Sequence, residues 1–214
     1  MRISLLCSDR QHPVNEYLQR WMKKHVTNHQ IELVYKKADL SGGDILFLVS
    51  CSEIIAAHER ARYRACLVMH ASNLPLGRGW SPLVWQIIDG VDNIILTLLE
   101  AEDKVDSGRV WTKLSIPIPF HALWNEINTN LFKAEIELIE FAIRNFETVT
   151  PQAQDNLIKA SYYSRRTPAD SEINPYQCIA SQFNKIRICD PNRFPAFFEL
   201  HGKKFKLTVE KIDE

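Results

Sequence analysis

The chain has 214 residues, enough for one domain or for one domain with a small appendage. Lysine plus arginine and aspartate plus glutamate both number 26, and the resulting zero net charge argues against a nucleic-acid partner. No apolar stretch approaches the roughly 20 residues of a membrane-spanning helix, which argues against a membrane partner. The first residues predict a strand rather than a secretion signal. The five cysteines form no Cys-x-x-Cys pair, so we expect a cytoplasmic protein with reduced thiols.

The first half of the chain alternates strand-like and helix-like segments. Helical spacing of apolar residues marks residues 12–26. The apolar runs typical of strands cover residues 2–8, 30–37, 43–50 and 64–70. Strands separated by helices imply a parallel sheet. Because residues 36–44 are too few for a full crossover helix, we predict an abbreviated doubly wound, Rossmann-like α/β sheet.

The second half continues this pattern as far as residue 150 and then changes character. The order predicted there is a helix at 82–92, a strand at 93–102, a turn at 103–110 and a long amphipathic helix at 123–146. An apolar outer stripe on that long helix would suit a homodimer interface. Beyond residue 150 we expect a loop, a helix at 178–189 and a β-hairpin around His201 and Gly202. The sequence therefore predicts a first unit at 1–150 and a small C-terminal α+β subdomain, with this hairpin, at 151–214.

His70 ends the apolar run of residues 64–70, and ligands of open α/β sheets gather at the carboxyl ends of strands. Asp106 follows the next predicted strand, and the helix and strand between them should return the chain to the same sheet edge. An aspartate that orients a histidine is a recurring acid–base arrangement. The alternative is a histidine that ends a strand and an aspartate that forms a turn, with no contact between them.

Two other chemistries fit the sequence less well. The turn after the first strand, residues 7–15, contains no glycine, whereas a dinucleotide fingerprint needs several. His25 and His29 have helical spacing, but no third ligand is evident, so we expect solvated histidines and no metal site.

The segments HASNLPLGRGWSPLVWQIIDG (70–90) and LLEAEDKVDSGRV (98–110) resemble the folate-dependent formyltransferases. That family includes methionyl-tRNA, glycinamide ribonucleotide and nucleotide-sugar N-formyltransferases. Its His-x-Ser-x-Leu-Pro, Arg-Gly and Asp-[Thr/Ser]-Gly elements match His70, Ser72, Leu74, Pro75, Arg78, Gly79, Asp106, Ser107 and Gly108. Residues 162–175 and 193–198 resemble later stretches of the tRNA and sugar enzymes, so the resemblance covers nearly the whole chain.

The resemblance implies transfer of a formyl group from 10-formyltetrahydrofolate, a co-substrate, to a primary amine in the unit at 1–150. His70 would be the base or the electrostatic partner of the tetrahedral intermediate, and Asp106 would hold it. Two segments match the family's pterin site: Ser52, Glu53, Ile54 and Ile55, and Glu102, Asp103, Lys104 and Val105. Ser52 also suits the N-cap of a helix.

One position departs from the family pattern. The family has Asn-x-His, and alternate residues of a strand project to the same face, so the asparagine can donate to the developing oxyanion. Here that position is Val68, which donates nothing. Asn73 is the nearest replacement, and we predict that it takes over the oxyanion role.

The choice of amine rests on the remainder of the chain. The tRNA enzymes usually carry a larger, basic C-terminal domain, so we expect a sugar amine, of the UDP-4-amino-4,6-dideoxy-N-acetyl-altrosamine type used for pseudaminic-acid-like sugars. The candidate substrate contacts are side chains that stack on rings or bind phosphates: Arg78, Trp80, Tyr162, Tyr163, Arg165 and Arg193. Trp85 is expected in the core. The alternatives are a methionyl-tRNA formyltransferase-like enzyme and a non-catalytic relative that binds folate or nucleotide sugar; Val68 keeps the second alternative open.

Overall fold

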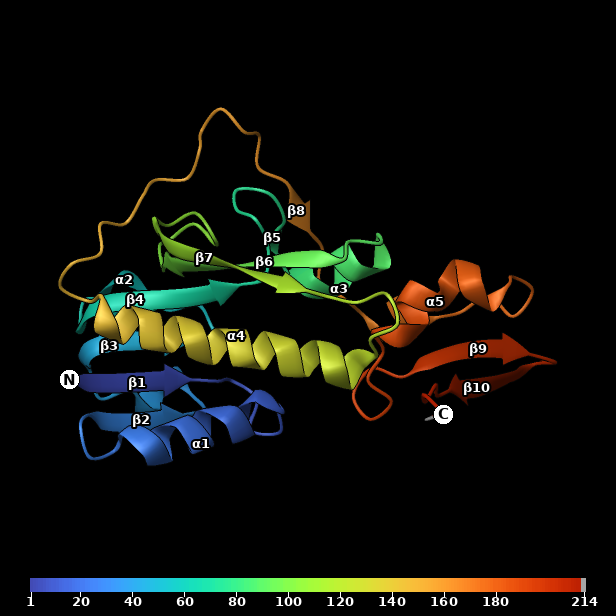
Figure 1. The fold of residues 1–214 in the computed structure, drawn as a ribbon, viewed down its shortest axis with the longest axis horizontal. Coiled ribbons are helices and arrows are strands. Elements are labelled where there is room, and N and C mark those ends of the chain that lie inside the picture. The colour runs from blue at the N-terminus through green and yellow to red at the C-terminus, as the bar shows by residue number, and fades with distance from the viewer. Residues whose placement is uncertain (213–214) are drawn as a thin grey trace.

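The computed structural model describes residues 1–212 and has a six-stranded sheet at its centre (Figure 1). The strand order is β2-β1-β3-β4-β6-β7. The strands are β1 (Arg2–Leu6), β2 (Gln30–Val34), β3 (Gly43–Leu48), β4 (Tyr63–His70), β6 (Asn93–Glu100) and β7 (Val110–Pro117). The predicted α/β, Rossmann-like class is confirmed, and β1 to β4 form the abbreviated doubly wound unit, with only a 3-10 turn (Lys37–Asp39) between β2 and β3.

The sheet is not parallel throughout, because β6 and β7 run against their neighbours. β1 pairs parallel to β2 and β3, and β3 to β4, but the β4–β6 and β6–β7 pairs are antiparallel. The connection from β4 to β6 contains α3 (Pro82–Ile88), whose seven residues rise only about 10 Å. The eight residues of β4 span about 26 Å. Helix α3 is too short to carry the chain back along the sheet, so β6 starts near the edge where β4 ends.

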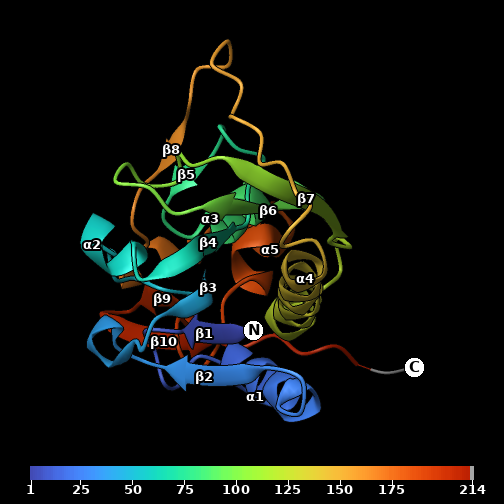
Figure 2. The same ribbon diagram turned by 90° about the vertical axis from the view of Figure 1, so that its left-hand side faces the viewer.

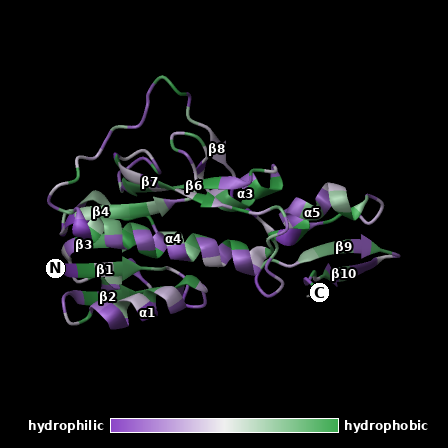
Figure 3. Ribbon diagram, in the orientation of Figure 1, coloured by the Kyte–Doolittle hydropathy of each residue, from purple (hydrophilic) through white to green (hydrophobic). Residues whose placement is uncertain are grey.

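Two helices, α1 (Val14–His25) and α4 (Trp124–Arg144), lie on the same face of this sheet (Figure 2). Their apolar side chains and those of the strands form the main core, which includes Leu18, Phe47, Leu67 and Leu138. The opposite face carries a smaller cluster around Leu46, covered in part by α2 (Ala57–Arg60). Figure 3 shows hydrophobic residues along the central strands and hydrophilic and hydrophobic residues alternating along α4.

The outer side of α4 does not carry the apolar stripe that would suit a homodimer interface. Its exposed residues are Asn125, Lys133, Glu137 and Arg144, all polar. The apolar residues of α4 pack on the sheet instead. The outer face of α4 therefore offers no apolar surface for the homodimer interface expected from the sequence.

The part of the chain beyond residue 150 forms a third apolar cluster around Ile173, Ile186 and Ala196. The predicted hairpin is confirmed as β9 (Ala196–Leu200) and β10 (Lys203–Leu207), and α5 (Ile179–Arg187) lies beside it. A short strand, β8 (Tyr162–Tyr163), pairs parallel with β5 (Arg78–Gly79), and a 3-10 turn covers Pro168–Ser171. A subdomain boundary near residue 150 stays a prediction.

None of the helices within residues 1–212 has the length and apolar character that crossing a bilayer requires.

A buried carboxyl group lies in the main core and predicts a pH dependence of stability. Glu135 on α4 is 4% exposed, and its Oε2 atom has no hydrogen-bond partner among the described residues. Burial raises its pKa from 4.5 to about 8. Because the native state holds this proton more tightly than the unfolded state does, stability is full below pH 4.5 and falls as the pH rises toward 8.

As the pH rises from 5 to 8, we therefore expect the free energy of unfolding of the wild type to fall by a few kcal/mol relative to that of the Glu135→Gln variant. Urea unfolding of both proteins at the two pH values measures this difference. The same change at exposed Glu137 serves as the control. Equal pH dependence in the wild type and the Glu135→Gln variant would contradict the assignment.

Candidate active site

His70 and Asp106 lie side by side although they are far apart in the sequence. His70 is the last residue of β4, and its Nδ1 atom lies 3.4 Å from Oδ1 of Asp106. Both side chains are almost fully buried, with 7% and 6% exposed. The structure therefore brings the two residues together, as expected from the sequence.

The route by which Asp106 reaches His70 differs from the predicted one. Since β6 is antiparallel to β4, its carboxyl end lies away from His70, and the loop 101–109 folds back to close the distance. Gly108 permits this fold, because a Cβ atom at that position would lie 1.9 Å from the carbonyl oxygen of Glu100. Asp106 itself adopts a left-handed backbone conformation, with φ of 54°. A folded-back loop therefore builds the pair, and no parallel crossover is involved.

Both ring nitrogens of His70 face oxygen acceptors. Nε2 lies 2.8 Å from the carbonyl oxygen of Gly77, which only accepts, and Nδ1 faces the Asp106 carboxylate. The Nε2–H group therefore donates to the Gly77 carbonyl. The backbone N–H of Gly79 donates to Oδ2 of Asp106 at 2.8 Å and fixes the carboxylate from its other side. Both roles expected for His70, base and electrostatic partner, stay predictions.

A cleft of about 440 Å³ lies between the loop 71–79, the loop 101–109 and the segment 150–160. Arg78 lines it, and its side chain is buried although its Nε atom has no hydrogen-bond partner among the described residues. Its guanidinium donates to Oε1 of Gln154 at 2.6 Å and to the Tyr162 hydroxyl at 3.3 Å, which lowers the pKa of that phenol. Arg109 lines the same cleft, as do the acidic residues Glu102 and Asp155, and the two guanidinium groups are its candidate contacts for an anionic group.

The two segments expected to hold the pterin lie close to each other. Arg60 joins them, since it donates to the carbonyl oxygen of Ile55 and to Oδ1 of Asp103, both at 2.6 Å. Ile54 and Val105 are 72% and 53% exposed, so each segment presents an apolar side chain to solvent. These residues fit a flat, partly apolar ring.

Several of the predicted pterin residues already have other contacts. Ser52 is not a helix N-cap, because α2 starts after Ala56; the Ser52 backbone N–H donates to Ser8 Oγ at 2.8 Å. The Glu53 carboxylate accepts from the Lys37 backbone N–H at 2.9 Å. Glu102 accepts from the hydroxyl of Ser107 on its own loop, and Lys104 is exposed. Backbone atoms, the apolar side chains and the exposed Lys104 are therefore the groups of these segments that remain for contact with a pterin.

The structure does not bring Asn73 to the His70–Asp106 pair. Asn73 is exposed, and its Oδ1 accepts from Lys113 Nζ at 2.7 Å. Lys113, on β7, also donates to the carbonyl oxygen of Leu74. The lysine binds the amide oxygen of Asn73, whereas an oxyanion donor would use the amide Nδ2–H group, so the oxyanion role of Asn73 stays a prediction.

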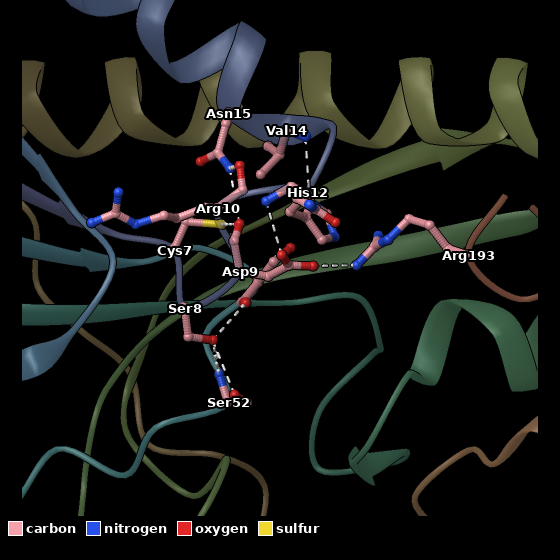
Figure 4. Close-up of polar contacts among 11 residues, drawn as sticks. Cys7, Ser8, Asp9, Arg10, His12, Val14, Asn15, Ser52 and Arg193 are labelled. Atoms are coloured by element: carbon pink, nitrogen blue, oxygen red, sulfur yellow. Dashed lines mark hydrogen bonds and ion pairs between the residues drawn. The ribbon is translucent and has the colours of Figure 1, made fainter.

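Arg193 lies in a different cluster, at the carboxyl ends of β1 and β3 (Figure 4). It forms an ion pair with Asp9 at 2.6 Å, in the turn after β1. His12 of that turn is half-buried, accepts from the Val14 N–H, and has its pKa lowered to about 4 by burial. Arg193 is thus paired with a carboxylate and has no contact with the cleft.

The remaining substrate candidates lie around the loop 71–79. The Tyr163 ring faces Gly77, where a Cβ atom would come within 2.8 Å of it. The Arg165 guanidinium lies 5.0 Å from the centre of the Trp80 ring. Trp85 is only half-buried, and its indole N–H donates to the carbonyl oxygen of Ser164.

Two contributors were missed by reasoning from the sequence. Gly77 supplies the carbonyl that binds His70, and Gln154 binds both Arg78 and the loop of Asp106. A glycine carbonyl and a lone glutamine in an irregular segment give no spacing signal, so only their contacts reveal them. Within residues 1–212, no group of three or more His, Cys, Asp or Glu side chains could hold a metal ion.

Sequence comparison finds relatives among the formyltransferases, whereas no family model matches the sequence. A methionyl-tRNA formyltransferase of Sulfurovum sp. (strain NBC37-1) is 30% identical over 144 residues, which cover 67% of this chain and 46% of that protein. The chain spans about half the length of the curated relatives it matches.

Solved structures share the fold at lower identity. Methionyl-tRNA formyltransferase from Clostridium thermocellum has a TM-score of 0.85 and 20% identity, over 100% of this chain and 94% of that one. HypX from Aquifex aeolicus in complex with tetrahydrofolic acid has a TM-score of 0.80 and 22% identity, over 98% and 37%. A sugar N-formyltransferase from Shewanella sp FDAARGOS_354 has a TM-score of 0.74 and 14% identity, over 100% and 99%.

The solved structures share the α/β fold of this chain, which carries a buried His–Asp pair at the end of β4. The relatives found by sequence comparison identify the family. The chain belongs to the folate-dependent formyltransferase family.

Proposed function

We propose that this chain transfers a formyl group from 10-formyltetrahydrofolate to the primary amine of a nucleotide-linked amino sugar, in the cytoplasm. The observation that carries the proposal is the contact between His70 and Asp106 beside a cleft lined by two arginines. The HypX structure with tetrahydrofolic acid supports a folate-derived donor. The sugar N-formyltransferase from Shewanella supports a sugar amine.

In the proposed reaction, the uncharged amine attacks the formyl carbon, and negative charge develops on the formyl oxygen. The bond from carbon to the folate nitrogen then breaks, the amine nitrogen loses a proton and the folate nitrogen gains one. The His70 ring stabilises the developing charge, and Asp106 holds the ring in place. The segments 52–55 and 102–105 would hold the donor, and Ile54 and Val105 would supply apolar contacts to its pterin.

Acceptor recognition is assigned to the cleft. Arg78 and Arg109 would bind the phosphates of the nucleotide, since guanidinium groups pair with phosphate oxygens in bidentate fashion. Tyr162 is 58% exposed beside Arg78 and would stack on the uracil or the sugar ring. The resemblance to pseudaminic-acid-type enzymes favours a UDP-4-amino-4,6-dideoxy-N-acetyl-altrosamine substrate.

A second candidate is formylation of methionyl-tRNA, which the curated sequence relatives favour. A third is binding of folate and nucleotide sugar without catalysis, which Val68 favours. Strongly salt-dependent binding of tRNA would separate the second candidate from the first, because phosphate contacts release counterions.

The test is incubation of the protein with 10-formyltetrahydrofolate and a panel of UDP- and dTDP-linked amino sugars, with charged methionyl-tRNA alongside. We expect a formylated sugar, detected by mass spectrometry, with at least one UDP-linked 4-amino sugar. Turnover of methionyl-tRNA alone would establish the second candidate. Nucleotide-sugar binding without turnover of any amine would overturn the catalytic proposal.

A further inference from the structure

Gln154 uses its amide to join two parts of the site. It is half-buried in the irregular segment that follows Pro151. Its Nε2 donates to the backbone carbonyl oxygens of Asp106 at 2.8 Å and Gly108 at 3.0 Å. Its Oε1 accepts from Arg78 Nη2 at 2.6 Å. The reverse amide orientation would place Oε1 against two carbonyl oxygens, so the partners fix this one.

The carbonyl contacts hold Asp106 in an uncommon backbone conformation. A φ of 54° is costly for a residue other than glycine and persists where the surroundings impose it. Gln154 binds the carbonyl groups on both sides of Ser107 and so fixes the loop at the point where it turns Asp106 toward His70. The Asp106 carboxylate can meet His70 Nδ1 only while this part of the loop stays in place.

From these contacts we infer that Gln154 is a positioning residue that couples Arg78 in the cleft to the orientation of the His70–Asp106 pair. It acts through Asp106 and Arg78, and it has no place among the reacting atoms. The inference rests on the proposed function for its kinetic consequence, while the orientation of His70 is measurable without any substrate.

Two substitutions separate the two halves of this role. Gln154→Met keeps the length of the side chain but removes all three hydrogen bonds. We expect kcat to fall on the order of 10- to 100-fold, because small displacements of catalytic groups carry such costs, and the KM for the acceptor to rise. Gln154→Glu keeps an acceptor for Arg78 and loses the two donors. It should lower kcat similarly and leave the KM near that of the wild type.

The matched control is Gln152→Met, two residues earlier. The Gln152 side chain is exposed and donates only to the nearby carbonyl of Thr150, so kcat and KM should both stay unchanged. Circular dichroism and thermal unfolding of all three variants report whether each is folded. A kcat for folded Gln154→Met within threefold of the wild type would overturn the inference.

Nitrogen-15 NMR of the His70 imidazole tests the same inference without turnover. The Nδ1 and Nε2 resonances of Gln152→Met should match those of the wild type, and the Nδ1 resonance should move in Gln154→Met. An unmoved resonance would overturn the positioning role. If the wild type formylates no amine, only the proposed function fails, and this measurement still decides the role of Gln154.

Discussion

The Asp106→Asn variant should lose on the order of 100-fold or more in kcat/KM for the acceptor while remaining folded. Asparagine retains the shape and can still accept from the Gly79 N–H. It removes the negative charge that faces His70 Nδ1, so the His70 ring loses the charged partner that holds it. Steady-state kinetics with 10-formyltetrahydrofolate and an amine found to be a substrate would measure the loss.

Asp92→Asn is the control for this experiment, because Asp92 is exposed at the start of β6 and has no part in the site. It should behave as the wild type. A loss of less than about tenfold in Asp106→Asn, with thermal unfolding unchanged, would show that Asp106 does not support the reaction.

The Val68→Asn variant should be a better catalyst than the wild type, with kcat raised on the order of 10- to 100-fold. Val68 and His70 are alternate residues of β4, so their side chains project to the same face. An amide at position 68 would donate to the formyl oxygen as charge develops, and removal of one such donor elsewhere costs about 3 kcal/mol. Kinetics under the same conditions would measure the gain.

Val68→Asp separates the amide donor from the change in polarity, since aspartate has the shape of asparagine but its carboxylate donates no hydrogen bond. It should give no gain. Val68 is half-buried against the Leu46 cluster, so both variants should lose some stability, on the order of 1 kcal/mol or more. A Val68→Asn rate at or below that of the wild type would show that this chain has a different oxyanion donor.

Most elements of the fold could be predicted from local patterns, but strand β7 at the edge of the sheet was missed. Helical spacing located α1 and α4, apolar runs located β1, β3, β4 and β6, and the His201–Gly202 turn located the β9–β10 hairpin. These patterns were sufficient because each element buries one face, and burial sets the period of its apolar residues. These patterns did not predict the direction of β6, because that direction depends on where the connection through α3 ends relative to the sheet.

The candidate site divides in the same way. The sequence by itself determined that His70 ends a buried strand, that Asp106 lies in the turn after a later strand, and that Val68 replaces a hydrogen-bond donor. The first two follow from residue identity and strand period, and the third from the resemblance to the formyltransferase family.

Only the tertiary structure decided how these residues meet. The loop 101–109 folds back over β6, and the Gly77 carbonyl contacts His70. Asn73 contacts Lys113, and Gln154 lies between Arg78 and Asp106. All of these are contacts between a loop and a distant segment. They depend on packing and on the pairing of backbone polar groups, which leave no period in the sequence.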